Sequence, residues 1–267
     1  MTFAIATIAP SIQFHCTNKE FPMSLIQTDN LTKIYGSGDT AVIALDHVGI
    51  QVKEGEFVAV MGPSGCGKST LLHLLGGLDR STEGKVVIDG TSLTDMKDDD
   101  LTKLRRKRIG FVFQFFNLIP VLTAVENAAL PVTLDGVKPI EARKRAAEWL
   151  ARFGLGDRLT SRPDQLSGGQ QQRVAVVRAL VAEPALILAD EPTGNLDTRS
   201  GDEIASLLRQ VTKEYKRTVV MVTHDPRIAA YADRIIFLKD GKVVDETQLE
   251  RKGAAEKIAN KMKEIGD

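Results

Sequence analysis

Residues 62–69, Gly-Pro-Ser-Gly-Cys-Gly-Lys-Ser, fit the spacing G-x-x-x-x-G-K-[ST] of a phosphate-binding loop. Glycines let the backbone turn tightly, so that successive N–H groups point inward at phosphate oxygens. A buried strand is predicted just before the loop, over Phe57–Met61, and a helix just after it, over Lys68–Leu75. A strand, a glycine-rich loop and a helix in this order restrict the chain to an α/β fold of the P-loop type.

We expect this loop to bind the phosphates of ATP together with Mg²⁺. Lys68 supplies a mobile positive charge for the β- and γ-phosphates, and the Ser69 hydroxyl can join the magnesium shell. The following helix adds its positive dipole end. The alternative is a chance glycine-rich turn, and the flanking strand and helix argue against it. The expected nucleotide-binding residues are Gly62, Pro63, Ser64, Gly65, Cys66, Gly67, Lys68, Ser69 and Thr70.

Composition bounds the class of the protein. The 267 residues suffice for one α/β unit with a subdomain, and 43% hydrophobic and 26% charged residues are ordinary for a globular chain. Lys+Arg and Asp+Glu are both 35, so no basic excess indicates nucleic acid as a partner. Cys16 and Cys66 lack a metal-ligand spacing, which favours a reducing, cytosolic setting. No run approaches the ~18 apolar residues of a membrane span, so we expect any membrane role to go through a partner.

The first 22 residues differ from the rest of the chain. Residues 2–12 are mostly apolar, but no basic residue precedes them and Pro10 interrupts them. No small-residue cleavage site follows, so a signal peptide is not indicated. We predict that residues 1–22 are a disordered tail or result from a start assigned too early, with Met23 as the true start.

Strand patterns alternate with helix patterns along the chain, which predicts a parallel sheet. Half-buried strands are expected over 25–32 and 43–52, and residues 115–165 are interpreted as a mostly helical insertion. Asp240-Gly241 predicts a tight hairpin, and 246–265 a charged, solvent-exposed helix. Further strands are predicted over 85–88, 109–113, 185–189, 218–222 and 234–238, and helices over 98–107, 123–153, 167–182, 200–214 and briefly after Pro226.

Two acids follow the apolar run 186–189. Ligands of open parallel sheets bind at the carboxyl ends of the strands, and Asp190 and Glu191 would emerge there. Asp190 can hold Mg²⁺ directly or through water, and Glu191 can accept a proton from an attacking water. The alternative is a solvated pair that caps a strand, and a P-loop in the same chain argues against it.

Residues 166–170, Leu-Ser-Gly-Gly-Gln, followed by Gln-Gln-Arg, closely resemble the signature sequence of the ABC ATPases. The resemblance covers residues 25 to about 245 and includes Tyr35, Gln114, the stretch 195–197 and His224 in the family's order. Ser167 and the two glycines open a helix, so they form a second N-terminus suited to an anion. The resemblance implies that Ser167, Gly168, Gly169 and Gln170 cover the γ-phosphate bound by a second copy, with two ATP molecules held in a head-to-tail dimer.

The same resemblance implies roles for further residues. Tyr35 would stack on adenine, although a strand-end aromatic without that role stays an alternative. Gln114 would reach Mg²⁺ and the attacking water, and Asp197 would link the two sites of the dimer. His224 would contact the γ-phosphate and orient Glu191. The expected catalytic residues are therefore Glu191, His224, Gln114 and Lys68, and the expected metal ligands are Ser69, Gln114 and Asp190.

The expected fold is a RecA-like P-loop core with an N-terminal antiparallel β subdomain and an inserted α-helical signature subdomain. We assign the ATPase domain to 23–246, with the signature helix at 167–182, and a C-terminal helix to 247–267. Residues 114–120, 122–127 and 189–197 resemble the group that serves lipoprotein release, macrolide-type export and related mechanotransmission.

That group implies an ATPase subunit at the cytoplasmic face of the membrane that drives a separate integral membrane permease, by export or by lipoprotein or lipid extraction. The permease would insert a short helix into a groove between core and insertion. Phe115, Phe116 and Leu118 are candidates for the groove, with core packing as the alternative.

Signalling or mechanotransmission without transport stays open as an alternative function. Ribosome-acting and DNA-repair ABC proteins fit poorly with one domain, zero net charge and no sustained heptads. A small-molecule kinase would leave the signature and His224 unexplained.

Overall fold

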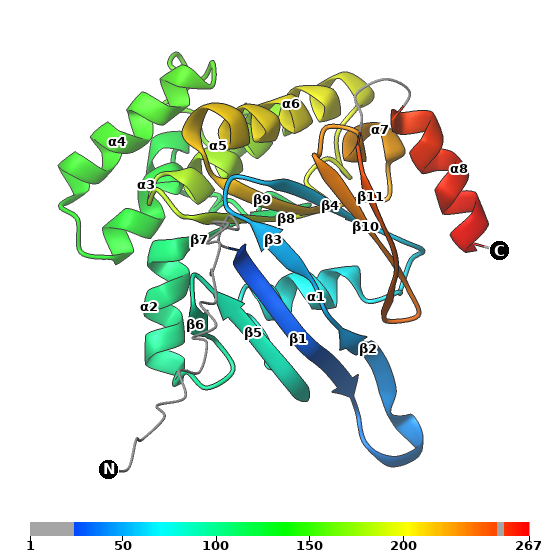
Figure 1. Ribbon diagram of the computed structural model, residues 1–267. Coiled ribbons are helices and arrows are strands. Elements are labelled where there is room, and N and C mark those ends of the chain that lie inside the picture. Colours follow the sequence, from blue (N-terminus) through cyan, green and yellow to red (C-terminus); the bar gives the residue numbers. More distant parts are fainter. Residues whose placement is uncertain (1–23, 250–253, 267) are drawn as a thin grey trace, which may run out of the picture.

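The structure is a computed structural model that describes residues 24–249 and 254–266, so the prediction for residues 1–22 lies outside the described residues. Two sheets stand on either side of one helix (Figure 1). The larger sheet has the strand order β11-β10-β4-β9-β8-β7, in which only β11 is antiparallel to its neighbour. Its strands are β4 (Phe57–Met61), β7 (Ile109–Phe113), β8 (Leu186–Asp190), β9 (Thr218–Val222), β10 (Arg234–Lys239) and β11 (Lys242–Gln248).

The smaller sheet is antiparallel and has the order β2-β1-β5-β6, with β3 also paired to β1. Its strands are β1 (Ser24–Tyr35), β2 (Val42–Val48), β3 (Gln51–Lys53), β5 (Glu83–Ile88) and β6 (Thr91–Ser92). The single strand predicted over 43–52 is therefore wrong, because it breaks after Val48. At the break the Thr28 hydroxyl donates to Val48 O and accepts from Ile50 N–H, while Thr28 N–H donates to Ile50 O.

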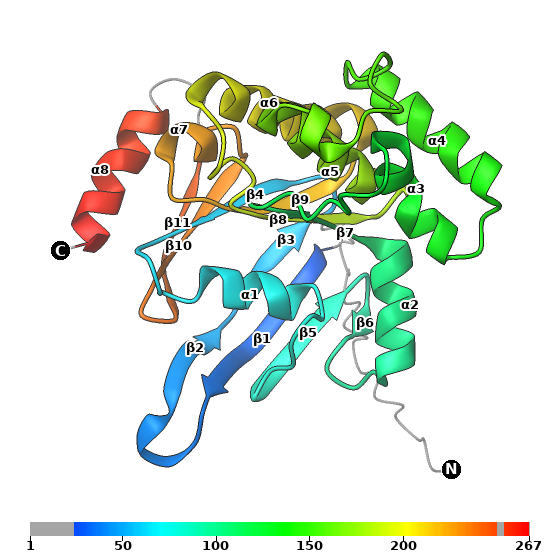
Figure 2. The same cartoon turned by 180° about the vertical axis from the view of Figure 1, so that it is seen from behind.

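Alternating side chains give each face of the parallel sheet its own core. In β4 all five residues are buried, with Phe57, Ala59 and Met61 on one face and Val58 and Val60 on the other. The second face packs on α1 (Lys68–Leu75), which lies between the two sheets (Figure 2). A strand buried on both faces reads as a continuous apolar run, which is why the sequence predicted it.

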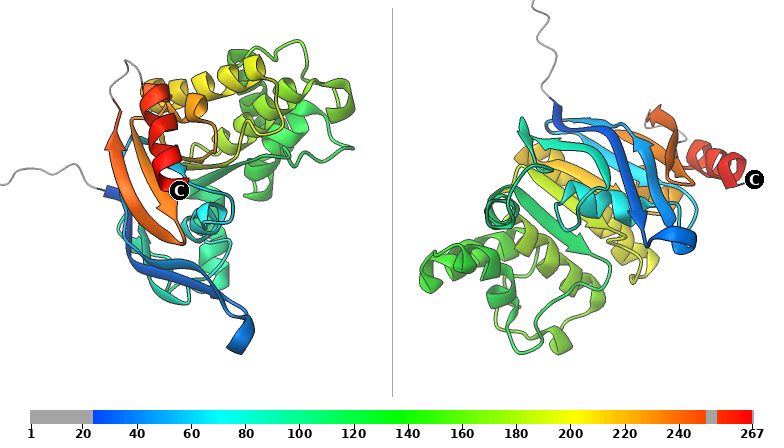
Figure 3. Two further views of the ribbon diagram at one scale, coloured as in Figure 1. Left: turned by 90° about the vertical axis from the view of Figure 1, so that its right-hand side faces the viewer. Right: turned by 90° about the horizontal axis from the view of Figure 1, so that it is seen from below.

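The remaining helices cover the first face of the sheet or surround it. The helical insertion lies to one side of the core, away from the β1–β2 hairpin (Figure 3). It contains α3 (Ala124–Leu134) and α4 (Pro139–Arg152). Gly136 has a positive φ between them, and Pro139 is the first residue of α4, a position that favours proline. The other helices are α2 (Asp98–Arg108), α5 (Gly168–Leu180), α6 (Thr198–Tyr215), α7 (Pro226–Ala229) and α8 (Ala254–Gly266), with short 3-10 turns at Gly38–Thr40 and Pro163–Gln165.

The prediction for the C-terminal part is wrong in two respects. Residues 246–248 belong to β11, since the hairpin at Asp240-Gly241 continues the antiparallel ladder with β10 as far as Gln248. The helix begins only at Ala254 in the described residues, and it is not solvated all round. Ala254, Ile258 and Ile265 are buried in the core that also contains α7. Their spacing gives α8 one apolar stripe that the charged residues had obscured.

Candidate active site

The predicted site residues meet at one edge of the parallel sheet. The P-loop follows β4, His224 follows β9, Asp190 ends β8 and Gln114 follows β7. These four strands are neighbours in the order β4-β9-β8-β7, so their carboxyl ends lie side by side. Ligands of such sheets bind at this edge.

Two glycines of the P-loop occupy positions that no larger residue could take. A Cβ at Gly62 would lie 2.0 Å from Leu238 O, and one at Gly67 would lie 2.2 Å from Ala44 O. Gly67 has φ of 100° and precedes α1 without a side-chain cap. The first N–H groups of α1 are therefore left without a capping side chain, as a phosphate site requires.

The charge of Lys68 lies over this loop. Its ammonium donates to Gly62 O at 2.9 Å and to Pro63 O at 2.8 Å, and the residue is only 9% exposed. Burial raises the pKa of the neighbouring Cys66 thiol, against a smaller lowering effect of the Lys68 charge. Cys66 is therefore a buried, protonated spacer in the loop.

Side-chain oxygen atoms from α1 and β8 lie close together beside the loop. Ser69 Oγ donates to Asp190 Oδ1 at 3.0 Å. His73 Nε2 lies 4.0 Å from Asp190 Oδ2. A hydroxyl beside a carboxylate is the type of oxygen set that Mg²⁺ binds together with phosphate and water, so these residues fit the ion. The sequence analysis missed His73, although its position four residues after Ser69 on a helix would have indicated it.

Glu191 and His224 form a pair at the same edge. His224 Nδ1 and Glu191 Oε2 are 3.0 Å apart, and the Glu191 side chain is 18% exposed while that of His224 is 70% exposed. Glu191 has φ of 46°, a left-handed conformation that is unfavourable for a residue with a Cβ. Its N–H donates to Val222 O at 3.0 Å, which helps to hold this conformation. Such strain is typical of functional positions.

Gln114 reaches the same edge, but it hydrogen-bonds to Asn195. Its Nε2 donates to Asn195 Oδ1 at 3.3 Å, and Asn195 Nδ2 donates back to Gln114 O at 3.1 Å. A Cβ at Gly194 would lie 2.8 Å from Gln114 Nε2, so a larger residue there would displace the Gln114 amide. The structure thus brings Gln114 beside the loop that follows Glu191 rather than onto the Ser69–Asp190 pair.

The signature segment forms the predicted helix N-terminus. Ser167 is the N-cap of α5, its Oγ accepts from Gln170 N–H at 3.3 Å, and Gln170 Oε1 accepts from Ser167 N–H at 2.9 Å. Gly168 and Gly169 lie against Leu196 and Ser200 of the following segment. Helices α1 and α5 pack on opposite faces of the parallel sheet, so Ser167 cannot close over the P-loop of its own chain.

A family described as ABC transporter matches residues 45–194, which is more than half of the chain. The chain belongs to the ABC transporter family. It is an ATP-binding and ATP-hydrolysing subunit of this family. The RecA-like core, antiparallel β subdomain and helical insertion predicted from the sequence are confirmed.

Three proteins that are similar to this ABC chain differ in name and in length. The ABC transporter ATP-binding protein MJ0796 of Methanocaldococcus jannaschii is 52% identical over 229 residues, which are 84% of this chain and 97% of that protein. Its dimeric structure in a post-hydrolysis state, bound to ADP and Pi, has a TM-score of 0.78, 50% identity, and covers 84% of this chain and 99% of its own.

The names of the other two relatives state a function. The lipoprotein-releasing system ATP-binding protein LolD of Geobacter metallireducens is 48% identical over 221 residues, 83% of this chain and 98% of that protein. The macrolide export ATP-binding/permease protein MacB of Hyphomonas neptunium is 47% identical over 232 residues, 87% of this chain and 36% of that protein.

Tyr35 of this ABC chain lies beside an ion pair. Its hydroxyl donates to Asp79 Oδ2 at 2.8 Å, and the Lys33 ammonium lies 4.7 Å from the ring centre and bonds to Asp79 Oδ1. Burial and then Asp79 raise the pKa of Tyr35, against a smaller lowering effect of Thr70 on α1. The residue is 42% exposed, so the ring is accessible for a flat partner beside the P-loop helix.

Asp197 caps α6, the helix whose Ser200 lies against Gly169 of the signature. Its carboxylate accepts from Ser200 N–H at 3.0 Å at the start of α6. The hydrogen bonds from Ser200 lower the pKa of Asp197. Asp197 therefore has a structural role within its own chain, whatever it contributes across a dimer.

A groove of about 340 Å³ separates the core from the helical insertion. Its walls are β7, the end of α2, α3 and α5, with Phe111, Phe113, Leu130 and Asn117 among the lining residues. The three predicted groove residues do not line it. Phe115 is 73% exposed, Phe116 lies near Gly168, and Leu118 packs on the main core. The backbone between them turns left-handed at residues 116 and 117.

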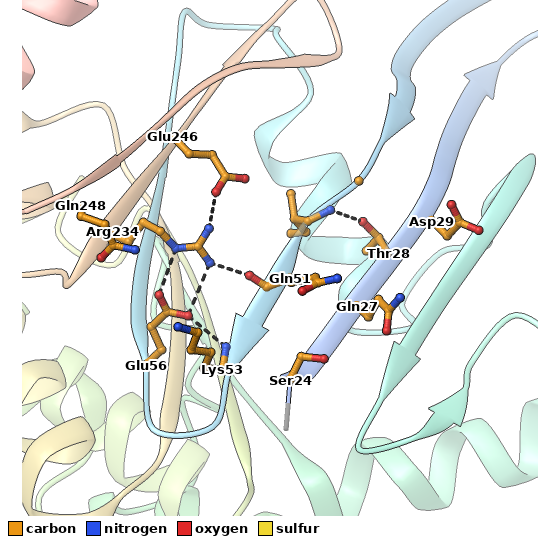
Figure 4. Close-up of a pocket in the computed structure, with 12 residues that line it drawn as sticks. Ser24, Gln27, Thr28, Asp29, Gln51, Lys53, Glu56, Arg234, Glu246 and Gln248 are labelled. Carbon is orange, nitrogen blue, oxygen red and sulfur yellow. Dashed lines mark hydrogen bonds and ion pairs between the residues drawn. The ribbon is translucent and has the colours of Figure 1, made fainter. Parts of the chain in front are cut away.

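A large cavity lies at the amino ends of the parallel strands, opposite the ends that carry the P-loop (Figure 4). It holds about 820 Å³ between β1, β3 and the β10–β11 hairpin. Arg234 forms one wall and donates to Glu56, Glu246 and Gln51 O. These contacts satisfy the guanidinium, so Arg234 ties β3, β10 and β11 together at this wall.

No helix in residues 24–249 and 254–266 combines the length and the apolar character that a membrane span requires.

Proposed function

We propose that this ABC ATPase works as a peripheral head-to-tail homodimer at the cytoplasmic face of a membrane, where it powers a separate permease subunit. The process served is export or the extraction of a lipoprotein or lipid. The names of the LolD and MacB relatives support transport over a purely signalling role. The observation that carries the proposal is the meeting of Lys68, Asp190 and the Glu191–His224 pair at one sheet edge, while Ser167 lies on a helix of the other face.

In this proposal the chain's own residues perform an in-line attack of water on the γ-phosphorus. Glu191 accepts a proton from the water, and His224 orients Glu191 and faces the γ-phosphate. The bond between the γ-phosphorus and the bridging oxygen breaks, so that ADP and phosphate form. Lys68 leaves its two carbonyl partners and neutralises developing charge on the phosphates. Mg²⁺, held by Ser69 and Asp190 and proposed also to contact Gln114, would supply further charge neutralisation.

The second copy supplies the signature. Its Ser167 hydroxyl accepts a hydrogen bond from Gln170 N–H and retains its own proton to donate to a γ-phosphate oxygen. The first backbone amides of its α5 add the positive end of a helix dipole. A two-fold axis makes both sites equivalent, since each site combines the P-loop of one copy with the signature of the other.

The groove between core and insertion is the proposed docking place of the permease. Apolar side chains of β7 and α3 would receive an apolar face of a short partner helix. Arg105 and Arg106 at the end of α2 also line the groove, which favours a partner helix that carries acidic residues.

The decisive experiment is capture of the tagged Glu191→Gln protein from its native membranes with ATP, followed by mass spectrometry. We expect a membrane protein with few spanning helices and a large extracytoplasmic domain to copurify. Recovery of ribosomal or DNA-repair proteins instead would contradict the transporter proposal while leaving the ATPase assignment intact.

A matched pair of variants tests the groove itself. Leu130→Glu introduces a charge into the groove, whereas Ile140→Glu introduces the same charge on α4 at a residue that is 86% exposed. We expect the first substitution, and not the second, to abolish capture of the permease in the Glu191→Gln background. Equal capture by both would exclude the groove as the docking place.

A further inference from the structure

One arginine of the signature helix holds the backbone that follows Gln114. Arg178 on α5 donates from Nη2 to Phe116 O at 2.7 Å and from Nη1 to Asn117 O at 2.5 Å. A guanidinium is a rigid planar fork, so two bonds to successive carbonyls fix the orientation of this backbone segment. Burial lowers the pKa of Arg178, although a guanidinium stays charged, so these carbonyls accept from a cation.

The segment that Arg178 holds is strained. Phe116 and Asn117 have φ of 61° and 50°, so two successive residues with a Cβ adopt the left-handed conformation. Single residues visit this region, but consecutive ones are disfavoured unless the surroundings hold them. The two bonds from Arg178 are such a constraint, because both accepted carbonyls belong to the strained residues.

The same helix also anchors the backbone on the other side of Gln114. Gln172, which is fully buried, donates from Nε2 to Phe113 O at 3.2 Å and to Pro192 O. Gln114 therefore stands between two backbone anchors that both come from α5. Its own side chain in turn pairs with Asn195, close after Glu191.

We propose that Arg178 is a positioning residue that clamps the turn at 116 and 117 and thereby sets where Gln114 stands relative to Asp190 and Glu191. This inference rests on the proposed part of Gln114 in hydrolysis. Arg178 and Asn117 also line the groove, so a partner helix in the groove contacts the clamp directly. The clamp connects the groove, Gln114 and the helix that begins with the signature.

The first test compares Arg178→Met with Arg80→Met in the full-length protein. Arg80 also donates to a backbone carbonyl, Met96 O, and it pairs with Asp98, but none of these three residues lines the groove. We expect kcat for ATP hydrolysis to fall about tenfold in Arg178→Met, because small misplacements near the reacting atoms cost this much or more. The concentration of Mg²⁺ needed for half-maximal rate should rise, while the KM for ATP stays within about twofold of the wild type.

Two further variants keep the proposal falsifiable if Arg178→Met folds poorly. Arg178→Lys retains the charge but not the fork, and should give a smaller loss of kcat with the same rise in Mg²⁺ requirement. Adding Asn117→Gly to Arg178→Met removes one left-handed penalty, and should restore part of kcat. Equal losses in Arg178→Met and Arg80→Met, an unchanged kcat, or no gain from Asn117→Gly would each overturn the proposal.

Gln114→Ala separates this inference from the function on which it rests. If Gln114→Ala lowers kcat and Arg178→Met does not, the clamp is refuted and the role of Gln114 stands. If Gln114→Ala hydrolyses ATP at the wild-type rate, the proposed role of Gln114 fails, and the clamp fails with it.

Discussion

Two helices of this protein begin with glycine-rich sequence and are proposed to face the same nucleotide, yet their N-termini are built differently. Gly67 precedes α1 in a left-handed conformation with no side-chain cap, enclosed by Ala44 O and Leu45. Ser167 precedes α5 in an extended conformation, is exposed, and forms a reciprocal capping box with Gln170. The first end is shaped by the surrounding chain, and we propose that it receives phosphate. The second is capped by its own residues, and in the proposed dimer it meets a nucleotide bound to the other copy.

We expect the largest effect from the loss of Lys68, the cation at the N-terminus of α1. Lys68→Ala removes the charge over the P-loop without removing the loop. We expect ATP hydrolysis to fall by about a thousandfold, the upper range for losing one electrostatic contact in a site. A phosphate-release assay with equilibrium nucleotide binding measures this, and a normal rate would contradict the proposed P-loop function.

Glu191→Gln should have the next largest effect, because it should slow ATP hydrolysis without preventing formation of the ATP-bound dimer. The amide cannot accept the proton, so the rate should fall by about a hundredfold while ATP still binds. Because the ATP-bound state then persists, the protein should elute as a dimer with ATP and as a monomer with ADP. Size-exclusion chromatography with light scattering checks this, and a variant that turns over at the wild-type rate would exclude Glu191 as the base.

A mixing experiment tests whether the second helix end acts in trans. Gly169→Asp places a negative charge at the start of α5, which favours the helix but repels phosphate. Neither Gly169→Asp nor Lys68→Ala alone should hydrolyse ATP. An equal mixture should recover about a quarter of the wild-type rate, since half of the dimers are mixed and each has one intact site. Absence of recovery would argue against a head-to-tail arrangement with independent sites.

The smallest expected effect is on stability. Ser167→Ala removes the side-chain half of the capping box and should lower the free energy of unfolding by about 1 kcal/mol. Chemical denaturation of the ligand-free chain measures this change. Gly67 offers no side-chain cap to remove, so the two helix ends differ here as well. A loss well above this value would mean that α5 depends on Ser167 for more than its cap.

Sequence reasoning succeeded for elements that depend on local backbone geometry. The P-loop, the Ser167 cap and the acids at the end of β8 all follow from a few adjacent residues, and the structure has each element where it was predicted. It failed at 246–248, where the charged residues resemble a helix, because pairing with β10 overrides local propensity. It also missed His73, Gln172 and Arg178, whose partners are distant in the sequence.

The sequence by itself determined the local elements of the proposed site: a P-loop motif, two acids at a strand end and a second glycine-rich helix start. These are encoded locally, since a glycine, an N-cap or a strand end needs only its neighbours to be defined. Only the tertiary structure decided that α1 and α5 lie on opposite faces of one sheet, and that Arg178 reaches carbonyls 61 and 62 residues earlier in the chain. Such contacts depend on how buried surfaces pack together, and packing is a property of the whole chain rather than of any segment.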